Sequence, residues 1–189
     1  LIGSYFVITY GILIAIILGF AILSIYFYST KIVDSGLGEF FVGVKGSMIV
    51  IGAFYIQSGE VNIESILAGI VVGTLSSLVL FIASFPDHDA DKSKGRKTLV
   101  IVVGKEKATK LFWIFPLFAY SIILIGISLN LFPLLSLICL LSLPLMIKSG
   151  LGLQKNYNSV SDLVPSMSSS LKSSRITGIL FVLSFLIPI

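Results

Sequence analysis

Charged residues are scarce in this sequence of 189 residues, where they make up 12% of the chain, whereas hydrophobic residues make up 56%. A soluble domain carries roughly a quarter charged residues, so the composition excludes an ordinary soluble globule. Disorder is excluded too, because disordered chains combine low hydrophobicity with high net charge. A lone cysteine, Cys139, excludes a disulfide framework and a cysteine-ligated zinc site. The composition therefore indicates an integral membrane protein.

Long apolar runs predict transmembrane helices, since about 20 apolar residues cross the hydrocarbon core of a bilayer. The uncharged run 111–147 is too long for one helix, and Asn130 with Pro133 predicts a turn inside it. The runs lack the alternation that is typical of an outer-membrane barrel. The serine-rich stretch 166–174 is expected to be a linker or an interfacial helix. We therefore predict an all-α, polytopic transmembrane helix bundle with about six spans: 5–28, 40–57, 65–85, 111–129, 132–147 and 176–189.

All 13 basic residues fall on one side of this predicted topology. The segments 31–45, 87–110 and 148–175 hold two, seven and four of them, whereas the charges on the opposite side are Glu60 and Glu64. Basic loops stay in the cytoplasm, so these three segments are predicted to be cytoplasmic in a multi-pass protein of the cell membrane. The net charge of +4 then reflects orientation in the lipid bilayer, and no nucleic acid partner is predicted.

The segment 85–99 concentrates charge directly after the third predicted span. Asp87 and Asp91 are spaced i,i+4, so both carboxylates share one face if the segment is helical. Two carboxylates together with phosphate oxygens of a substrate suit Mg²⁺. Basic side chains that are able to hold phosphate follow at once: Lys92, Arg96 and Lys97. The alternative is a solvated interfacial loop whose charges pair among themselves.

Other polar and aromatic residues near this side carry weaker signals. Asp89 lies on the other helical face and is expected to cap or support the loop, and His88 is expected to be exposed to solvent. The stretch 36–39, Gly-Leu-Gly-Glu, is typical of a turn between two helices. Tyr26 and Tyr28 are typical of an aromatic belt at the membrane surface, with a π-lined wall for a cation as the functional alternative.

The aspartate-rich segment resembles a known family. Asp87-x-x-x-Asp91-Lys92-x-x-Gly95-Arg96-Lys97-Thr98-Leu99 resembles the second aspartate-rich motif of the UbiA-type intramembrane prenyltransferases. Further stretches look most like the menaquinone branch of that family, the 1,4-dihydroxy-2-naphthoate polyprenyltransferases. These stretches are 26–31, 36–39, 52–57 and 144–148.

The resemblance implies nine transmembrane helices and two aspartate-rich motifs on the cytoplasmic side. The first motif has the form Asn-x-x-x-Asp-x-x-x-Asp, and residues 1–189 contain no match to it. We therefore expect a single prenyltransferase-like domain, 1–189, that corresponds to helices four to nine and lacks the N-terminal helices and the first motif. Such a chain is expected to be inactive or strongly impaired by itself.

The resemblance also implies an activity and a site. The activity is Mg²⁺-dependent transfer of a polyprenyl group from polyprenyl diphosphate to an aromatic acceptor such as 1,4-dihydroxy-2-naphthoate. Asp87 and Asp91 would be the catalytic and metal-binding residues. The residues implied in substrate binding, as phosphate ligands or as a wall of the prenyl tunnel, are Lys31, Lys92, Arg96, Lys97, Tyr26, Tyr28 and Tyr55.

Three alternatives stay open at this point. The first is that the same site serves another acceptor: geranylgeranylglyceryl phosphate, 4-hydroxybenzoate or a porphyrin-derived ring. The second is that the chain is a non-catalytic, truncated homologue. A small transporter is disfavoured, because the predicted spans contain almost none of the ionisable groups that mark ion pathways. Self-association into a homo-oligomer is compatible with all of these.

Overall fold

The computed structural model describes residues 1–27 and 36–187, and this part of the chain is helical without any strand. The helices are α1 (Ile2–Tyr10), α2 (Ile12–Phe27), α3 (Gly38–Ser58), α4 (Ile63–Ala83), α5 (His88–Ser93), α6 (Leu99–Val103), α7 (Lys105–Leu111), α8 (Ile114–Ser128), the 3-10 helix η3 (Leu134–Ser142), α9 (Leu143–Asn156) and α10 (Val160–Leu186).

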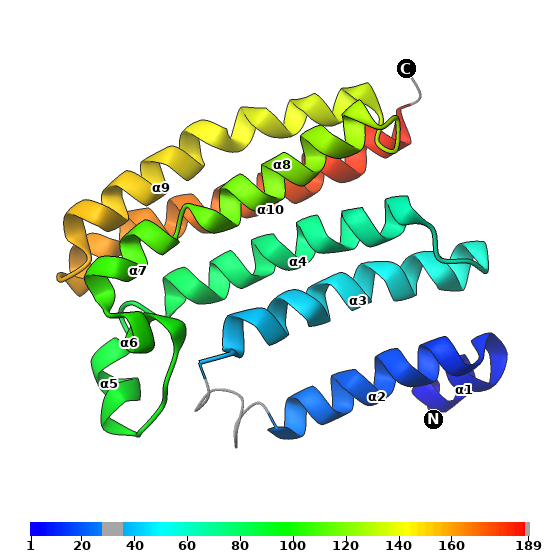
Figure 1. Cartoon of the computed structure of the whole chain (residues 1–189), viewed down its shortest axis with the longest axis horizontal. Helices are drawn as coiled ribbons and strands as arrows, with labels where there is room; N and C mark the ends of the chain where they lie inside the picture. The colour runs from blue at the N-terminus through cyan, green and yellow to red at the C-terminus, as the bar shows by residue number, and fades with distance from the viewer. Residues whose placement is uncertain (28–35, 188–189) are drawn as a thin grey trace.

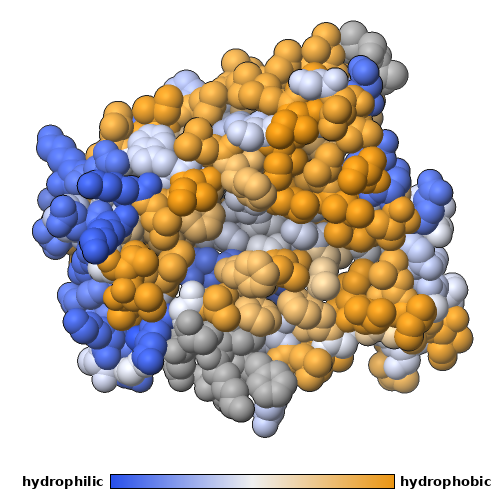
Figure 2. Space-filling view, in the orientation of Figure 1, coloured by the Kyte–Doolittle hydropathy of each residue, from blue (hydrophilic) through white to orange (hydrophobic). Residues whose placement is uncertain are grey.

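The long helices lie alongside one another, and the short helices α5, α6 and α7 gather at one end of them (Figure 1). Four described stretches are long and apolar enough to cross a membrane, and α2 is a shorter apolar helix. Hydrophobic residues cover the sides of these helices, whereas hydrophilic residues gather around the short helices (Figure 2). The predicted all-α, polytopic membrane bundle is confirmed. The four stretches are Gly38–Ser58, Ile63–Ala83, Lys105–Ser128 and Leu134–Asn156.

The predicted turn at Asn130 is confirmed, and it closes a hairpin of two long helices. Asn130 has a φ of 55°, and the Leu131 and Phe132 amides both donate to the carbonyl of Gly126, at 2.8 and 3.0 Å. The turn directs η3 and α9 back along α8. Between these helices, α4 and α10 lies the apolar core, whose largest buried side chains include Phe81, Phe85, Phe112, Ile123 and Met146.

The first predicted span, 5–28, is wrong as a single helix. The chain breaks at Gly11, where φ is 81° and ψ is −159°, and α1 ends just before it. Such a backbone conformation is available to glycine at no steric cost, because glycine has no Cβ. Apolar residues on both sides of Gly11 hide this break in the sequence, since they continue the apolar run without interruption.

The serine-rich stretch 166–174, expected to be a linker or an interfacial helix, is part of a long helix, so the linker is wrong. It lies within α10, which begins at Val160 rather than at 176. Most of its serines are buried, and two hydrogen bonds link the stretch to neighbouring helices. Ser149 Oγ donates to the Ser166 carbonyl at 2.8 Å, and Ser173 Oγ donates to the Ser142 carbonyl at 2.9 Å. Small side chains that hydrogen-bond across helices are typical of packing in membranes.

The segment 148–175, predicted to be cytoplasmic, is helical over most of its length. Lys148 and Lys155 lie on α9, and Lys172 and Arg175 lie on α10. These helices extend beyond the apolar runs that predicted them, so the basic residues of this segment lie on helix surfaces. The sidedness of the protein in the membrane stays a prediction.

Helices α3 and α4 approach each other through small residues. A Cβ built on Gly69 would lie 2.8 Å from the Ser47 carbonyl oxygen, and one built on Gly73 would clash with the Gly43 carbonyl oxygen. The space around Gly43 is equally restricted, since a Cβ built on it would lie 2.6 Å from Ser77 Oγ. Glycines at such spacing let two helix backbones come close in a membrane. This contact holds one wall of the cavity described below.

Candidate functional site

The aspartate-rich loop begins at the end of α4 and forms the short helix α5. Asp87 directly precedes the first residue of α5, and the Asp91 amide donates to the Asp87 carbonyl at 2.8 Å. This bond is the i,i+4 bond of a helical turn, which puts residues four apart on one face. The predicted arrangement of these two carboxylates on one helical face is therefore present.

The chain reverses its direction at Gly95, after the end of α5, and this reversal places Arg96 beside Asp91. Gly95 has a φ of 76°, its amide donates to the Lys92 carbonyl at 3.1 Å, and the Arg96 amide donates to the Asp91 carbonyl at 3.0 Å. This pair of bonds around a left-handed glycine is the Schellman motif. The chain reversal brings Arg96 Nη1 to 2.9 Å from Asp91 Oδ1. Arg96 is thus positioned to contact an anionic group that binds beside Asp91.

The two carboxylates fit a Mg²⁺ ion that is shared with a substrate. The Asp87 side chain is exposed and makes no capping hydrogen bond to α5, and Asp91 has one oxygen in the pair with Arg96. Within residues 1–27 and 36–187, no group of three or more acidic, histidine or cysteine side chains is placed to hold a metal. Mg²⁺ is commonly held by one or two carboxylates together with phosphate oxygens and water, which matches this donor set.

The other predicted phosphate ligands lie on the same loop or outside the described residues. Lys92 and Lys97 are exposed, one on α5 and one between α5 and α6, so both ammonium groups are available to an anion. Lys31 and Tyr28 belong to residues 28–35, which lie outside the described part of the chain. Their predicted roles stay predictions.

The two remaining tyrosines lie at opposite ends of the helices. Tyr26 is exposed near the end of α2. Tyr55 lies near the end of α3 that is farthest from α5, and its hydroxyl donates to the Tyr10 carbonyl at 3.1 Å. At 1.5 Å per residue, Tyr55 is about 25 Å along the helix from Gly38. Tyr55 therefore ties α3 to the break between α1 and α2, and a place for it in a tunnel wall stays a prediction.

Asp89 connects α5 to α7, in keeping with the supporting role expected from its position. His88 Nδ1 lies 2.7 Å from Asp89 Oδ1, and Lys105 Nζ lies 3.5 Å from Asp89 Oδ2. His88 is only 13% exposed, so the expectation of a solvent-exposed histidine is wrong. The hydrogen bond from His88, and then the charge of Lys105, lower the pKa of Asp89.

We expect an NMR titration of the Asp89 carboxyl to show a pKa below the usual range of aspartate, because both neighbours favour the ionised form. His88→Ala should raise this pKa more than Lys105→Met, since the histidine hydrogen bond is the larger cause. The contact between α5 and α7 is then fully present above the ordinary aspartate pKa and is lost as the pH falls through the lowered one. An ordinary or raised pKa in the unsubstituted protein would contradict this.

A largely apolar cavity of about 610 Å³ lies between α3, α4 and α8. The face seen in Figure 2 is hollowed between α8 and α3. Glu39, in the first turn of α3, lines it and is buried with 4% of its surface exposed. Reasoning from sequence missed Glu39 as a functional residue, because it was taken as part of a turn. The available signal was an acidic residue next to an apolar run, on the side predicted for the aspartates.

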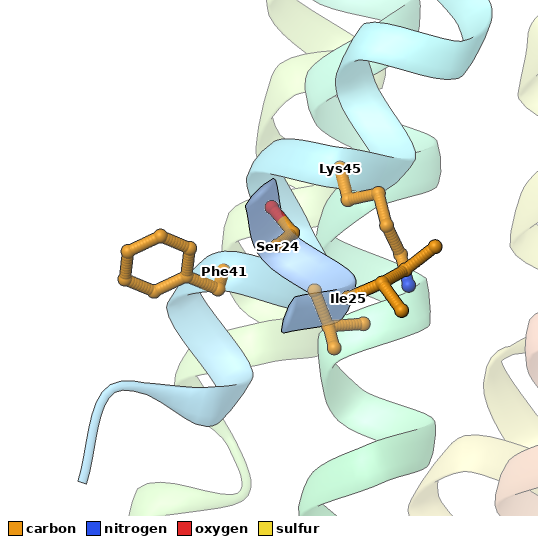
Figure 3. Close-up of a pocket in the computed structure, with 5 residues that line it drawn as sticks. Ser24, Ile25, Phe41 and Lys45 are labelled. Atoms are coloured by element: carbon orange, nitrogen blue, oxygen red, sulfur yellow. The ribbon is translucent and has the colours of Figure 1, made fainter. Parts of the chain in front are cut away.

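A smaller pocket of about 320 Å³ lies between α2 and α3 (Figure 3). Ser24 and Ile25 of α2 and Phe41 and Lys45 of α3 line it. Its described lining offers a lysine and a hydroxyl group but no carboxylate, so these residues do not provide the oxygen ligands that Mg²⁺ prefers. Residues 41 and 45 lie on a different face of α3 from Glu39, so the two pockets are separate.

These features define a class of protein: a multi-pass helical membrane protein with a loop of carboxylates and basic groups at one end of its bundle. The chain belongs to the UbiA prenyltransferase family, whose model matches residues 1–168.

Two curated proteins are similar to the chain, and both are named 1,4-dihydroxy-2-naphthoate octaprenyltransferase. The Escherichia coli protein is 30% identical over 157 residues, which cover 78% of this chain and 48% of that protein. The Bacillus subtilis protein is 37% identical over 75 residues, which cover 39% of this chain and 24% of that protein. The matched part thus spans about half the length of these relatives or less. No solved structure matches the chain at a significant level.

Proposed function

We propose that the protein transfers a polyprenyl group from polyprenyl diphosphate to an aromatic acceptor, with 1,4-dihydroxy-2-naphthoate as the first candidate acceptor. Membership of the prenyltransferase family supports the reaction, and the names of the two relatives support the acceptor. The observation that carries the proposal is the Asp91–Arg96 pair on a loop beside a cavity of about 610 Å³. We further propose a single domain in the cell membrane, with this loop on the cytoplasmic side.

The proposed chemistry divides between the loop and the cavity. Asp87 and Asp91 would hold Mg²⁺ together with the diphosphate, while Lys92, Arg96 and Lys97 would bind the remaining phosphate charge. Bound Mg²⁺ would stabilise the negative charge that develops on the departing diphosphate.

The bond between C1 of the prenyl group and oxygen breaks, and its electron pair leaves with the diphosphate. A ring carbon of the acceptor supplies the electron pair for the new carbon–carbon bond. Where that carbon carries a hydrogen atom, the hydrogen then leaves as a proton, which restores the aromatic ring. An apolar cavity excludes water, which would otherwise compete as the nucleophile.

A transfer assay tests this proposal. The full-length protein in lipid nanodiscs is incubated with radiolabelled polyprenyl diphosphate and one acceptor at a time, with Mg²⁺ or with EDTA. The acceptors are 1,4-dihydroxy-2-naphthoate, 4-hydroxybenzoate and geranylgeranylglyceryl phosphate. We expect a prenylated product from the naphthoate only when Mg²⁺ is present. A product from another acceptor would reassign the substrate, and no product from any acceptor would refute transferase activity and favour a non-catalytic homologue.

A further inference from the structure

The cavity between α3, α4 and α8 has two unlike walls. One wall comes from α3 and α4 and mixes small residues, such as Gly43 and Ser47, with larger apolar ones, such as Met48. The other wall is formed by bulky apolar side chains of α8, including Phe115 and Phe118. Ligand pockets in proteins commonly measure about 300–1,000 Å³ and combine apolar walls with a few polar groups. The volume of about 610 Å³ is therefore sufficient for an aromatic ring system.

The Glu39 carboxylate is the polar group of this cavity that lacks a hydrogen-bond partner among the described residues. Ser77 Oγ donates to the Glu39 carbonyl at 2.7 Å, whereas Ser47 and Thr74 donate to carbonyls of their own helices, at 3.0 and 2.7 Å. Both carboxylate oxygens of Glu39 are buried. The backbone amides of Glu39 itself and of Leu99 lie nearby, yet neither carboxylate oxygen completes a hydrogen bond to a described residue. Burying a carboxylate without hydrogen bonds is unfavourable, so such a group in a cavity points to a ligand that donates hydrogen bonds.

Glu39 lies where the cavity meets the aspartate-rich loop. Leu99, the first residue of α6, lines the cavity and follows directly on that loop. The turn before α3 also touches the loop, because a Cβ built on Gly36 would lie 3.3 Å from the Lys97 carbonyl oxygen. A molecule held against Glu39 would therefore be close to a diphosphate held by the loop.

The chemistry of the two proposed substrates decides which of them Glu39 recognises. A prenyl chain has no hydrogen-bond donor, and a diphosphate is an anion that a carboxylate repels. A hydroxylated aromatic ring has O–H donors at its edge and apolar faces that suit the phenylalanine wall. Hydrogen bonds to a carboxylate are also among the stronger ones in proteins.

We propose that Glu39 binds the aromatic acceptor by accepting a hydrogen bond from a ring hydroxyl, while the apolar walls of the cavity hold the ring. This inference rests on the proposed function. It assigns the cavity to the acceptor and makes the ring hydroxyl the group that is recognised. A carboxylate on the acceptor would turn away from Glu39, toward the basic residues of the loop.

Direct binding tests this site without turnover. Calorimetry with the full-length protein in nanodiscs compares 1,4-dihydroxy-2-naphthoate with its dimethoxy analogue, which lacks the two O–H donors. We expect the unsubstituted protein to prefer the dihydroxy ring by at least about tenfold, as a hydrogen bond to a charged group commonly provides. Glu39→Gln should remove most of this preference, and Glu39→Asp should retain part of it. Equal binding of the two rings by the unsubstituted protein would refute the proposal without any variant.

A control separates the site from the fold and from the proposed reaction. Glu60→Gln makes the same change on an exposed residue just beyond the other end of α3 and should leave both affinities unchanged. Glu39→Gln should leave Mg²⁺-dependent binding of polyprenyl diphosphate intact, and its loss would assign Glu39 a structural role and overturn the proposal. An unchanged rate of prenyl transfer in Glu39→Gln would refute the role of Glu39 but not the proposed reaction. If the unsubstituted protein bound the dihydroxy ring selectively but transferred no prenyl group, the proposed function would be refuted and the role of Glu39 in binding would stand.

Discussion

Asp91→Asn is expected to reduce Mg²⁺-dependent binding of polyprenyl diphosphate at least about 100-fold, because even groups that only support metal ligands contribute 10–100-fold to affinity. The substitution keeps the size of the side chain but removes the charge that the metal requires. It also leaves Arg96, now 2.9 Å from Asp91 Oδ1, without its anionic partner. Asp87→Asn should have a similar effect, since both carboxylates lie on one helical turn. Calorimetry with and without Mg²⁺ measures the change.

Asp89→Asn is the matched control for this result. It makes the same chemical change within α5, but Asp89 points to His88 and Lys105 instead of sharing the face of Asp87 and Asp91. We expect binding within about threefold of the unsubstituted protein, because exposed ion pairs contribute little. If all three variants bound diphosphate equally well, the assignment of the loop as the metal and diphosphate site would be wrong.

Gly73→Ala is expected to destabilise the protein by about 1–3 kcal/mol, the usual cost of overpacking a close contact. The new Cβ would clash with the Gly43 carbonyl oxygen on α3, and a backbone atom cannot rotate away as a side chain does. Separation of α3 from α4 would also widen the cavity that both helices line. Thermal unfolding in detergent should show a lower midpoint, and affinity for the aromatic acceptor should fall with it.

Gly178→Ala provides the comparison on α10. A Cβ at Gly178 meets nothing within 4 Å, so alanine should be neutral or slightly stabilising there, as is usual for glycine in a helix. A change in the unfolding midpoint of the same size in both variants would show that close packing of α3 and α4 is not the cause.

The sequence predicted local features well where one short segment contains all the information. The pair Asp87 and Asp91 lies on a helical turn as its spacing predicted, and the turn at Asn130 joins two long helices as its residue types predicted. The apolar runs predicted the class of fold because the bilayer imposes a minimum length on every span. These predictions depend on residues a few positions apart, so no long-range contact was needed.

Other features could not be predicted because they depend on contacts between distant residues. The serines of α10 look polar in sequence, yet Ser166 and Ser173 are buried where α10 packs against its neighbours. Hydrogen bonds cross that contact, from Ser149 Oγ to the Ser166 carbonyl and from Ser173 Oγ to the Ser142 carbonyl. The break at Gly11 lies in an uninterrupted apolar run, where one glycine is no reliable signal. Both errors arise because hydropathy records the composition of a segment and not the surface against which it packs.

By itself the sequence determined that the chain is a helical membrane protein and that its carboxylates and basic groups gather in one loop, since composition and spacing are properties of the chain alone. Only the tertiary structure placed Glu39, 4% exposed and without a side-chain partner among the described residues, in a cavity beside that loop. Its burial results from the packing of α3 against α4 and from the position of Leu99 and α8. The free energy of a carboxylate depends on those surroundings, and no short stretch of sequence contains them.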